Sequence, residues 1–416
     1  MNRKQLTLLL FLVVVLGFAG LMIYKKQNDI SQEGDPALGK KLLGDFPVND
    51  VGRITLKQGT NELILVKKDN LWRVRERNDY PANYSDISSF LLKARDLKIS
   101  QNEGKVGPSQ LARLELAPGQ GTNAALVVEF KDQNDKPIQS LLLGKKHLRK
   151  SNRPSPLGDE MGDSGGWPDG RYVKVGTGSD NVVVINDALS NIEPKPDQWL
   201  NKDFFKVEKA RSLAVSFPVA TNSWKLTRDN ETAEWKLAEA KPAEQLDSSK
   251  ISGLSSALSS PTFSDVETAA KPEQCGLDKP TLVAIDTFDN FTYALRIGQK
   301  TNDAYPLTLT VEAQLLKERT PGKDEKAEDK TRLDKEFRDK QQKLAEKLAQ
   351  EKSFEKWIYL VSSWSLEPVL KERSQLLQEK KEEPKKAEKT GAAAAEAPKL
   401  PDLPLPAGTN ADTGTN

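Results

Sequence analysis

The sequence has almost none of the side chains on which most metalloenzymes and nucleophilic enzymes depend. Its 416 residues include one cysteine, Cys275, and one histidine, His147. A single cysteine excludes an intrachain disulfide and a cysteine-cluster metal site. A single histidine removes most zinc-hydrolase, Ser-His-Asp and histidine-relay mechanisms. We therefore expect no catalytic residue, no metal ligand set and no cofactor, and we interpret the protein as non-enzymatic.

An excess of charge of one sign is also missing. Lys and Arg together number 62, and Asp and Glu together number 60. This balance gives the chain no overall field that would attract nucleic acid, so we predict no nucleic-acid partner. The length exceeds one typical hydrophobic core, and two domains of roughly 150 to 180 residues are expected.

One long uncharged segment stands near the N-terminus. Leu6–Tyr24 contains no charged residue in 19 positions, and two basic residues flank each of its ends. At about 1.5 Å per residue, a helix of this length spans roughly 28 Å, close to the hydrocarbon thickness of a bilayer. We predict that residues 1–30 form an uncleaved signal anchor, with cleavage near Ala19-Gly20 as the alternative. Because so few residues precede the segment, we expect the body to face the periplasm or the exterior.

The rest of the chain contains an internal repeat, with copies at residues 45–205 and 206–377. The segments at 54–74 and 213–237 each predict a strand, a turn, a strand, an Asp-Asn turn and a third strand that carries Trp72 or Trp235. A helix is expected next in each copy. Its N-cap is predicted at Ser85-Asp86 in the first copy and at Asp247-Ser248-Ser249 in the second.

The later parts of the two copies also correspond. A Leu-then-Pro element, at 116–118 and 277–280, precedes two strands, and the second strand ends at Gly144 or Gly298. We interpret 172–175 and 358–361 as matching closing strands, and 187–200 and 366–377 as helical tails. The predicted fold class is α+β: two tandem copies of a mainly antiparallel β-sheet domain with packed helices, preceded by one transmembrane helix.

This order of anchor, strands, Trp, helix, Leu-x-x-Pro and L-x-I-G strand resembles the bacterial family known as domain of unknown function 4340. The resemblance implies a membrane-anchored envelope protein with tandem copies, held in the cytoplasmic membrane. It also implies gliding-motility-type ABC transporter subunits as a partner class. The shared motifs are structural, so no functional residue carries over from the family.

Two insertions and a tail depart from the plain repeat. Residues 145–170 form a Gly-, Pro- and Ser-rich loop in the first copy, and residues 320–352 form a highly charged segment in the second. The second insertion predicts a solvated helix with i,i+4 ion pairs such as Glu328/Arg332 and Asp334/Arg338. Its narrow apolar stripe consists of Leu333, Phe337, Leu344 and Leu348. The helix either folds back on its own domain or forms a partner-docking, coiled-coil-like arm.

The C-terminal tail, residues 378–416, alternates Lys and Glu and then becomes rich in Ala and Pro. A segment of this composition buries too little apolar surface to offset its chain entropy, so we expect disorder.

Several residues are weak candidates for chemistry. His147 lies in the basic stretch 145–150 and could help to bind a phosphate or an anionic glycan, although we favour a surface-loop histidine. Cys275 is expected to be a small packed residue rather than a nucleophile. The acidic residues of the first insertion resemble a loose calcium site, although their spacing does not match an EF-hand. They are Asp159, Glu160, Asp163 and Asp169.

Glycines and tryptophans complete the candidates. The run at 176–178 is expected to form a hairpin turn rather than a phosphate loop, because strand-like segments flank it on both sides. Trp72 and Trp235 are expected in the cores of their sheets. Trp167 and Trp199 lie in or near predicted loops and are candidates for surface contacts.

The leading functional hypothesis is a membrane-anchored scaffold or accessory subunit that binds other envelope proteins, including subunits of an ABC-transporter-type assembly. The alternative is an envelope protein that binds or hydrolyses glycan or polysaccharide. Hydrolysis requires two carboxylates facing one cleft. Glycan binding predicts a pocket at the domain junction, near residues 199–205.

Overall fold

The computed structural model describes residues 35–117, 124–149, 167–176, 178, 180–242, 244–268, 272–322 and 325–378. The predicted anchor at Leu6–Tyr24 lies outside these residues, as do most of the first insertion and almost all of the predicted disordered tail. None of the helices in the described residues is both long enough and apolar enough to cross a membrane.

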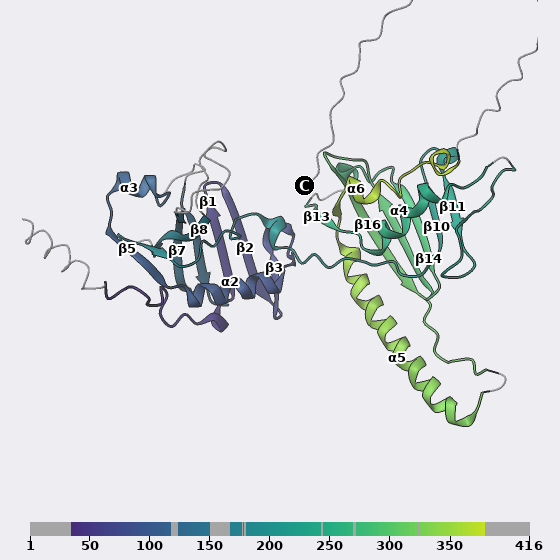
Figure 1. The fold of residues 1–416 in the computed structure, drawn as a ribbon, viewed down its shortest axis with the longest axis horizontal. Helices are drawn as coiled ribbons and strands as arrows, with labels where there is room; N and C mark the ends of the chain where they lie inside the picture. Colours follow the sequence, from purple (N-terminus) through teal and green to yellow (C-terminus); the bar gives the residue numbers. More distant parts are fainter. Residues whose placement is uncertain are drawn as a thin grey trace, which may run out of the picture. The chain divides into compact units, whose positions relative to one another are not determined.

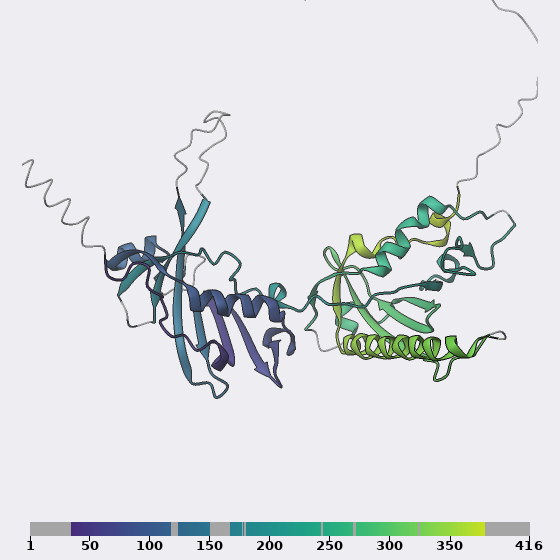
Figure 2. The same cartoon turned by 60° about the horizontal axis from the view of Figure 1, so that its bottom comes forward.

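The first sheet has nine antiparallel strands in the order β4-β3-β2-β1-β6-β7-β8-β9-β5 (Figure 1). The strands are β1 (Arg53–Gln58), β2 (Asn61–Lys68), β3 (Leu71–Val74), β4 (Tyr80–Pro81), β5 (Ile99–Lys105), β6 (Leu126–Lys131), β7 (Pro137–Arg149), β8 (Trp167–Val175) and β9 (Asn181–Ile185). The β7–β8 pair is the longest in the sheet, and Figure 2 shows it extending past the neighbouring strands.

The second sheet has eight antiparallel strands in the order β12-β11-β10-β14-β15-β16-β17-β13. They are β10 (Ala210–Ser216), β11 (Trp224–Thr227), β12 (Lys236–Leu237), β13 (Phe263–Val266), β14 (Thr281–Thr287), β15 (Phe291–Ile297), β16 (Ala304–Ala313) and β17 (Tyr359–Ser362). Large antiparallel sheets with a few helices make the fold α+β, as predicted.

The α-helices of the described chain are α2 (Tyr84–Asp96), α3 (Pro108–Arg113), α4 (Ser248–Ser259), α5 (Ala327–Lys352) and α6 (Ser363–Leu366). The short 3₁₀ segments are η1 (Val48–Asp50), η2 (Arg75–Arg77), η3 (Pro196–Trp199), η4 (Ala220–Asn222), η5 (Pro272–Cys275), η6 (Ser353–Lys356) and η7 (Arg373–Leu376).

The strand orders of the two sheets match position by position. Without the edge strand β4, the first sheet reads β3-β2-β1-β6-β7-β8-β9-β5, and each strand has a counterpart at the same place in the second sheet. In both sheets a helix, α2 or α4, follows the third strand and precedes the strand at the far edge. The connections between strands therefore follow the same path twice within the described residues.

This order corrects the predicted match between closing strands. The segment 172–175 belongs to β8, whose counterpart is β16, whereas 359–362 is β17, whose counterpart is β9. The two insertions consequently lie in connections that do not correspond. The first is between β7 and β8, and the second is between β16 and β17. Both closing segments are short apolar strands, which explains how they could be matched wrongly from sequence.

Helix boundaries agree with the sequence in part. The second-copy cap is confirmed, because the Asp247 carboxylate accepts a hydrogen bond from Ser249 N at 3.0 Å. In the first sheet's helix the cap is Asn83, two residues before the predicted Ser85, and its side-chain oxygen accepts from Ser85 N and Asp86 N. The predicted helical tails are wrong. Only η3, α6 and η7 form there, because prolines in both segments, Pro194 and Pro368 among them, interrupt a continuous helix.

Gly144 and Gly298 stand where another segment crosses the sheet. A Cβ on Gly144 would lie 2.3 Å from the carbonyl oxygen of Leu114, and one on Gly298 would lie 2.8 Å from that of Cys275. In each crossing segment a residue with positive φ, Glu115 (55°) or Gly276 (66°), precedes a buried leucine. Glycine is required at both positions because only a missing side chain permits such a close approach.

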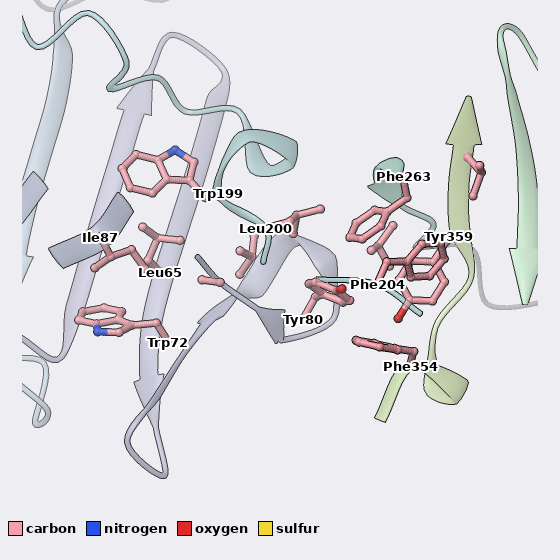
Figure 3. Close-up of a cluster of buried hydrophobic side chains, with 14 of the residues drawn as sticks. Leu65, Trp72, Tyr80, Ile87, Trp199, Leu200, Phe204, Phe263, Phe354 and Tyr359 are labelled. Atoms are coloured by element: carbon pink, nitrogen blue, oxygen red, sulfur yellow. The ribbon is translucent and has the colours of Figure 1, made fainter. Parts of the chain in front are cut away.

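Aromatic side chains form a buried cluster around Tyr80. Its ring lies 6.0 Å from that of Phe263 and 6.2 Å from that of Tyr359, and Phe204 lies 4.5 Å from Tyr359 (Figure 3). Such edge-to-face and tilted arrangements are favourable for aromatic rings. Burial raises the pKa of the Tyr80 hydroxyl to about 12, which keeps this group neutral in the core.

Candidate functional site

The most distinctive element outside the shared strand order is α5. It runs for 26 residues from Ala327 to Lys352 and contains no Gly or Pro. Arg332 pairs with Glu336 at 2.8 Å and with Asp329 at 3.3 Å. The predicted solvated helix is therefore confirmed, although Arg332 uses these two partners and not Glu328.

The C-terminal half of α5 docks on its own sheet. Leu344 and Leu348 pack against the hydrophobic core. Glu351, only 4% exposed, accepts hydrogen bonds from Lys206 N at 3.0 Å and from the Tyr293 hydroxyl at 2.7 Å. Burial raises the pKa of the Glu351 carboxyl, and burial together with Glu351 raises the pKa of Tyr293. This half of the helix folds back on its domain, as one of the two interpretations predicted.

Two ion pairs on the surface support the same docking. Lys340 Nζ lies 2.7 Å from Asp289 Oδ1, and Lys347 Nζ lies 2.8 Å from Glu208 Oε2. Lys347 also lies over the ring of Phe291, 5.5 Å from its centroid. Each contact links α5 to a different segment of the second sheet, so this end of the helix is fixed in direction.

The N-terminal half of α5 is different. Leu333 and Phe337 continue the apolar stripe but remain partly exposed, and within the described residues they are not part of the hydrophobic core. Figure 1 shows these turns lying beyond the ends of the strands. Arg319, which pairs with Glu325 and Asp334, ties the preceding chain to this half. A fixed helix with a partly exposed apolar stripe is suited to bind a partner surface.

His147 lies on β7 and not in a loop as predicted. Its Nδ1 is 2.7 Å from Asp169 Oδ1 on β8, and its ring meets Tyr172 edge-on at 5.8 Å. The hydrogen bond from His147 lowers the pKa of Asp169. A cavity of about 480 Å³ adjoins the histidine, and residues 145–148 of the basic stretch line it.

The other polar candidates have structural surroundings. Cys275 is buried beside Gly298, as expected for a packed residue, and burial raises the pKa of its thiol. Asp159, Glu160 and Asp163 lie outside the described residues, and Asp169 is engaged with His147. Across the described ranges, no three His, Cys, Asp or Glu side chains are placed to hold a metal ion.

The glycine run and the tryptophans follow the sequence predictions only in part. β8 and β9 pair antiparallel on either side of 176–178, so a hairpin is confirmed there. Trp72 is buried, whereas Trp235 is partly buried with the Arg228 guanidinium 4.7 Å above its ring. Trp167 is 84% exposed, as expected for a surface contact, but it lies on β8. Trp199 was predicted at the surface and is instead buried, with its indole N–H donating to Glu193 O at 3.0 Å.

Cavities flank the segment for which a junction pocket was predicted. One of about 270 Å³ is lined by Gln198 and Trp199 together with α2. Another, of about 420 Å³, is lined by Asp203, Glu208 and Glu351 among others. The second cavity brings carboxylates together, but both oxygens of Glu351 already accept hydrogen bonds from Lys206 and Tyr293.

Some residues of these sites had no signal in the sequence. The cavity beside His147 also contains Arg113 from α3, Glu103 from β5 and Tyr172 from β8. Glu103, Arg113 and Tyr172 lie 44, 34 and 25 positions from His147 along the chain, and only the fold brings them to one cavity. The Tyr293–Glu351 hydrogen bond likewise joins residues 58 positions apart.

Comparisons with known proteins give one match. The model of the family described as Domain of unknown function (DUF4340) matches residues 157–280, a segment that runs from the end of the first sheet into the second. No curated protein and no solved structure matches the chain. The resemblance to the domain of unknown function 4340 inferred from the sequence is therefore confirmed over residues 157–280.

Proposed function

We propose that the protein is a non-enzymatic, membrane-anchored scaffold or accessory subunit of the bacterial envelope that binds another protein through the N-terminal half of α5. The length and lack of charge of Leu6–Tyr24 support the anchor. The family resemblance implies an envelope location and makes ABC transporter subunits a candidate partner class. In this arrangement the body faces the periplasm or the exterior.

The observation that carries the proposal is the contrast within α5. Leu344 and Leu348 are packed on the sheet, whereas Leu333 and Phe337 on the same stripe are partly exposed. Burial of Glu351 at one end and the Arg319 ion pairs near the other hold the helix in place. A preorganised helix loses little entropy on binding, which favours association with a groove on a partner.

We further propose that the two sheets are tandem copies of one domain. Support comes from the matched strand order, from the helix after the third strand, and from Gly144 and Gly298 at equivalent crossings. Duplication explains why the two copies share a framework but differ in their insertions, since loops tolerate change more readily than paired strands. The insertions are therefore the regions where function is expected.

The alternative, an envelope protein that binds or hydrolyses glycan, has less support. Hydrolysis needs one carboxyl to donate a proton and a second to act on the sugar. Glu351 has a raised pKa, as a proton donor needs. Its two oxygens, however, accept hydrogen bonds from Lys206 N and the Tyr293 hydroxyl, and these bonds fix α5 to the sheet. A carboxyl engaged in this way has a structural role, so we favour protein binding.

The test is site-specific photocrosslinking of the full chain in its native membranes. A crosslinking residue at Phe337 is expected to give a discrete adduct with another envelope protein. The matched control is the same residue at Lys335, which is exposed on the opposite side of the helix and is expected to give little or none.

A second arm removes the apolar stripe without altering the docked half. Leu333→Asp combined with a crosslinker at Phe337 is expected to abolish the adduct, because a charge on the stripe opposes burial. No adduct at Phe337, or equal adducts at Phe337 and Lys335, would refute binding through α5.

A further inference from the structure

The cavity beside His147 is lined by residues from separate elements, and three of its nine lining side chains are Lys or Arg. Its volume is about 480 Å³, and its wall contains Arg113, Lys145, Lys146, His147, Glu103 and Tyr172. These residues come from α3, β5, β7 and β8. The volume lies in the range of sites for small molecules, so the cavity has room for a ligand larger than one inorganic ion.

An irregularity in β7 places two consecutive lysines on this wall. Neighbouring side chains of a regular strand point to opposite faces. The β7–β8 register shifts between Leu143 and Lys146, and Lys145 N donates to Leu114 O at 2.8 Å. A bulge of this kind redirects side chains, and both Lys145 and Lys146 consequently line the cavity.

Among the described residues, carboxylates offset these cationic groups only in part, and Glu193 is the one that interacts electrostatically with Lys146. Among the described residues, no carboxylate lies within ion-pair distance of Arg113, Lys145 or Lys146. Asp169 is occupied by His147, at 2.7 Å. Glu103 is therefore the one carboxylate among the lining residues, and it faces three permanent positive charges. A concave site with this imbalance attracts an anion.

We propose that this cavity binds a phosphate ester that also carries hydroxyl groups, such as a glycerol phosphate group. Arg113 has the planar donor geometry for bidentate contact with phosphate oxygens, and the two lysines supply point charges. Glu103, Gln110 and Tyr172, on the same wall, have acceptors and donors for the hydroxyls. The proposal is independent of the protein partner proposed for α5.

The second sheet has no equivalent of this site. The residues that follow Gly298 are Gln299, Lys300 and Thr301, and the chain turns back at once, with Thr301 bridged to Ala304. In the first sheet β7 continues to Arg149 and β8 begins at Trp167. The cationic wall is thus a property of the extended β7–β8 hairpin.

A glycerol phosphate group can come from a soluble metabolite or from a phospholipid headgroup. The hairpin also exposes two large apolar side chains, Leu148 at 46% and Trp167 at 84%. Exposed aromatic and apolar residues next to basic ones are typical of surfaces that enter the interfacial region of a membrane. These two residues therefore distinguish the sources.

The experiment uses the full chain in nanodiscs of phosphatidylcholine. Glycerol 3-phosphate is titrated by calorimetry, with glycerol as the uncharged control. Binding is expected for the wild type and is expected to weaken about tenfold or more in Lys145→Gln/Lys146→Gln. The matched control, Lys67→Gln/Lys136→Gln, removes two lysines at the opposite end of the sheet and is expected to bind as the wild type does.

A second arm measures co-flotation of the nanodiscs with vesicles of phosphatidylcholine, with or without phosphatidylglycerol. Loss of phosphatidylglycerol-dependent flotation in Leu148→Ser/Trp167→Ser, with glycerol 3-phosphate binding retained, identifies the lipid as the source. Glycerol 3-phosphate binding without flotation identifies a soluble ligand, and both results support the site. The proposal is overturned if the wild type binds neither probe, or if the control variant loses binding as much as the Lys145/Lys146 variant. Arg113→Gln, on a different element, repeats the test should the double variant fail to fold.

Discussion

In the first sheet the connection that leaves the shared strand order joins β7 to β8, whereas in the second sheet it joins β16 to β17 and contains α5. The first connection lengthens the β7–β8 hairpin, and residues of this hairpin line a cavity with cationic side chains. The second adds a helix whose two halves have different surroundings. The same strand order therefore carries two surfaces with different chemistry: a cavity with three Lys or Arg side chains in its wall, and a helix with a partly exposed apolar stripe.

The framework is similar because its constraints are similar. Each sheet is crossed by a segment whose carbonyl oxygen packs against a glycine, and the leucine after the positive-φ residue, Leu116 or Leu277, is buried. A strand pair opposite such a crossing cannot change freely without loss of packing. Connections at the sheet ends have no such constraint, which is why the two sheets differ there.

The largest expected effect is the loss of stability when Gly144 or Gly298 is replaced, which tests whether the two close crossings constrain their sheets alike. Gly144→Ala is expected to destabilise the protein by about 3 kcal/mol or more, because the new Cβ would meet Leu114 O at 2.3 Å. Gly298→Ala, with its closest contact at 2.8 Å, is expected to cost about 1–3 kcal/mol. Chemical denaturation followed by circular dichroism measures both values.

The control for this pair is Gly253→Ala on α4. There the new Cβ would lie 3.5 Å from Pro368 Cβ, an ordinary contact, and a helical Gly→Ala change is expected to stabilise by about 0.5–1 kcal/mol. If Gly144→Ala were tolerated as well as Gly253→Ala, the two crossings would not constrain the sheets in the way argued above.

The second effect concerns the docked half of α5. Glu351→Ala leaves Lys206 N and the Tyr293 hydroxyl without their acceptor and is expected to cost about 2–3 kcal/mol. Loss of the two Glu351 hydrogen bonds also loosens the docked half of α5. Amide exchange in 340–352 is therefore expected to accelerate, while exchange in the first sheet stays unchanged. Acceleration in both sheets alike would contradict a role confined to α5.

The pH dependence at Glu351 has a defined sign. The pKa of this carboxyl is raised above 4.5 in the folded protein, so the folded state retains a proton that the unfolded state loses. Stability from this group is greatest below pH 4.5 and falls as pH rises through the folded pKa. Glu351→Gln is expected to remove this fall, as measured by denaturation across that window.

Much of the framework was predictable from local patterns. The strand predicted to end at Gly298 is β15, which buries every second residue. The predicted strand end at Gly144 was wrong, because β7 continues to Arg149. The Asp247 cap and the matching glycines, Gly144 and Gly298, were also readable, because caps and close approaches impose a residue type at one position. Such features depend on nearby chain and need no knowledge of the whole fold.

Other features depended on contacts distant in sequence. The segment 172–175 of β8 was matched wrongly to β17 because both are short alternating runs, and only strand pairing distinguishes a middle strand from its neighbour. Trp199 follows two prolines in an apparent loop, yet its indole is buried against Phe90 at 6.0 Å between ring centroids. Part of the cationic cavity was predictable, because the basic stretch 145–150 stands out in the sequence. Nothing in the sequence indicated that Arg113 and Glu103 lie beside it.

The smallest expected effect is a difference in acid sensitivity between the N-caps of α2 and α4. Asn83 caps α2 without titrating, and Asn83→Ala is expected to cost about 1 kcal/mol at any pH. Asp247 caps α4 as a carboxylate, and hydrogen bonds led by that from Ser249 lower its pKa below 3.8. Stability from Asp247 is therefore present above pH 3.8 and lost as pH falls through the lowered folded pKa. Acid should accordingly loosen α4 before α2.

Amide exchange of α2 and α4, compared at about pH 6 and about pH 2.5 after correction for intrinsic rates, measures this difference. Asp247→Asn keeps a side-chain acceptor for Ser249 N but cannot be protonated, so it is expected to abolish the acid-dependent loosening of α4. If α4 in Asp247→Asn loosened in acid as much as in the wild type, the acid sensitivity would arise elsewhere in the second sheet. The contrast between a neutral and a titrating cap would then have no consequence for stability, and the two helices would be equivalent in acid as they are in strand order.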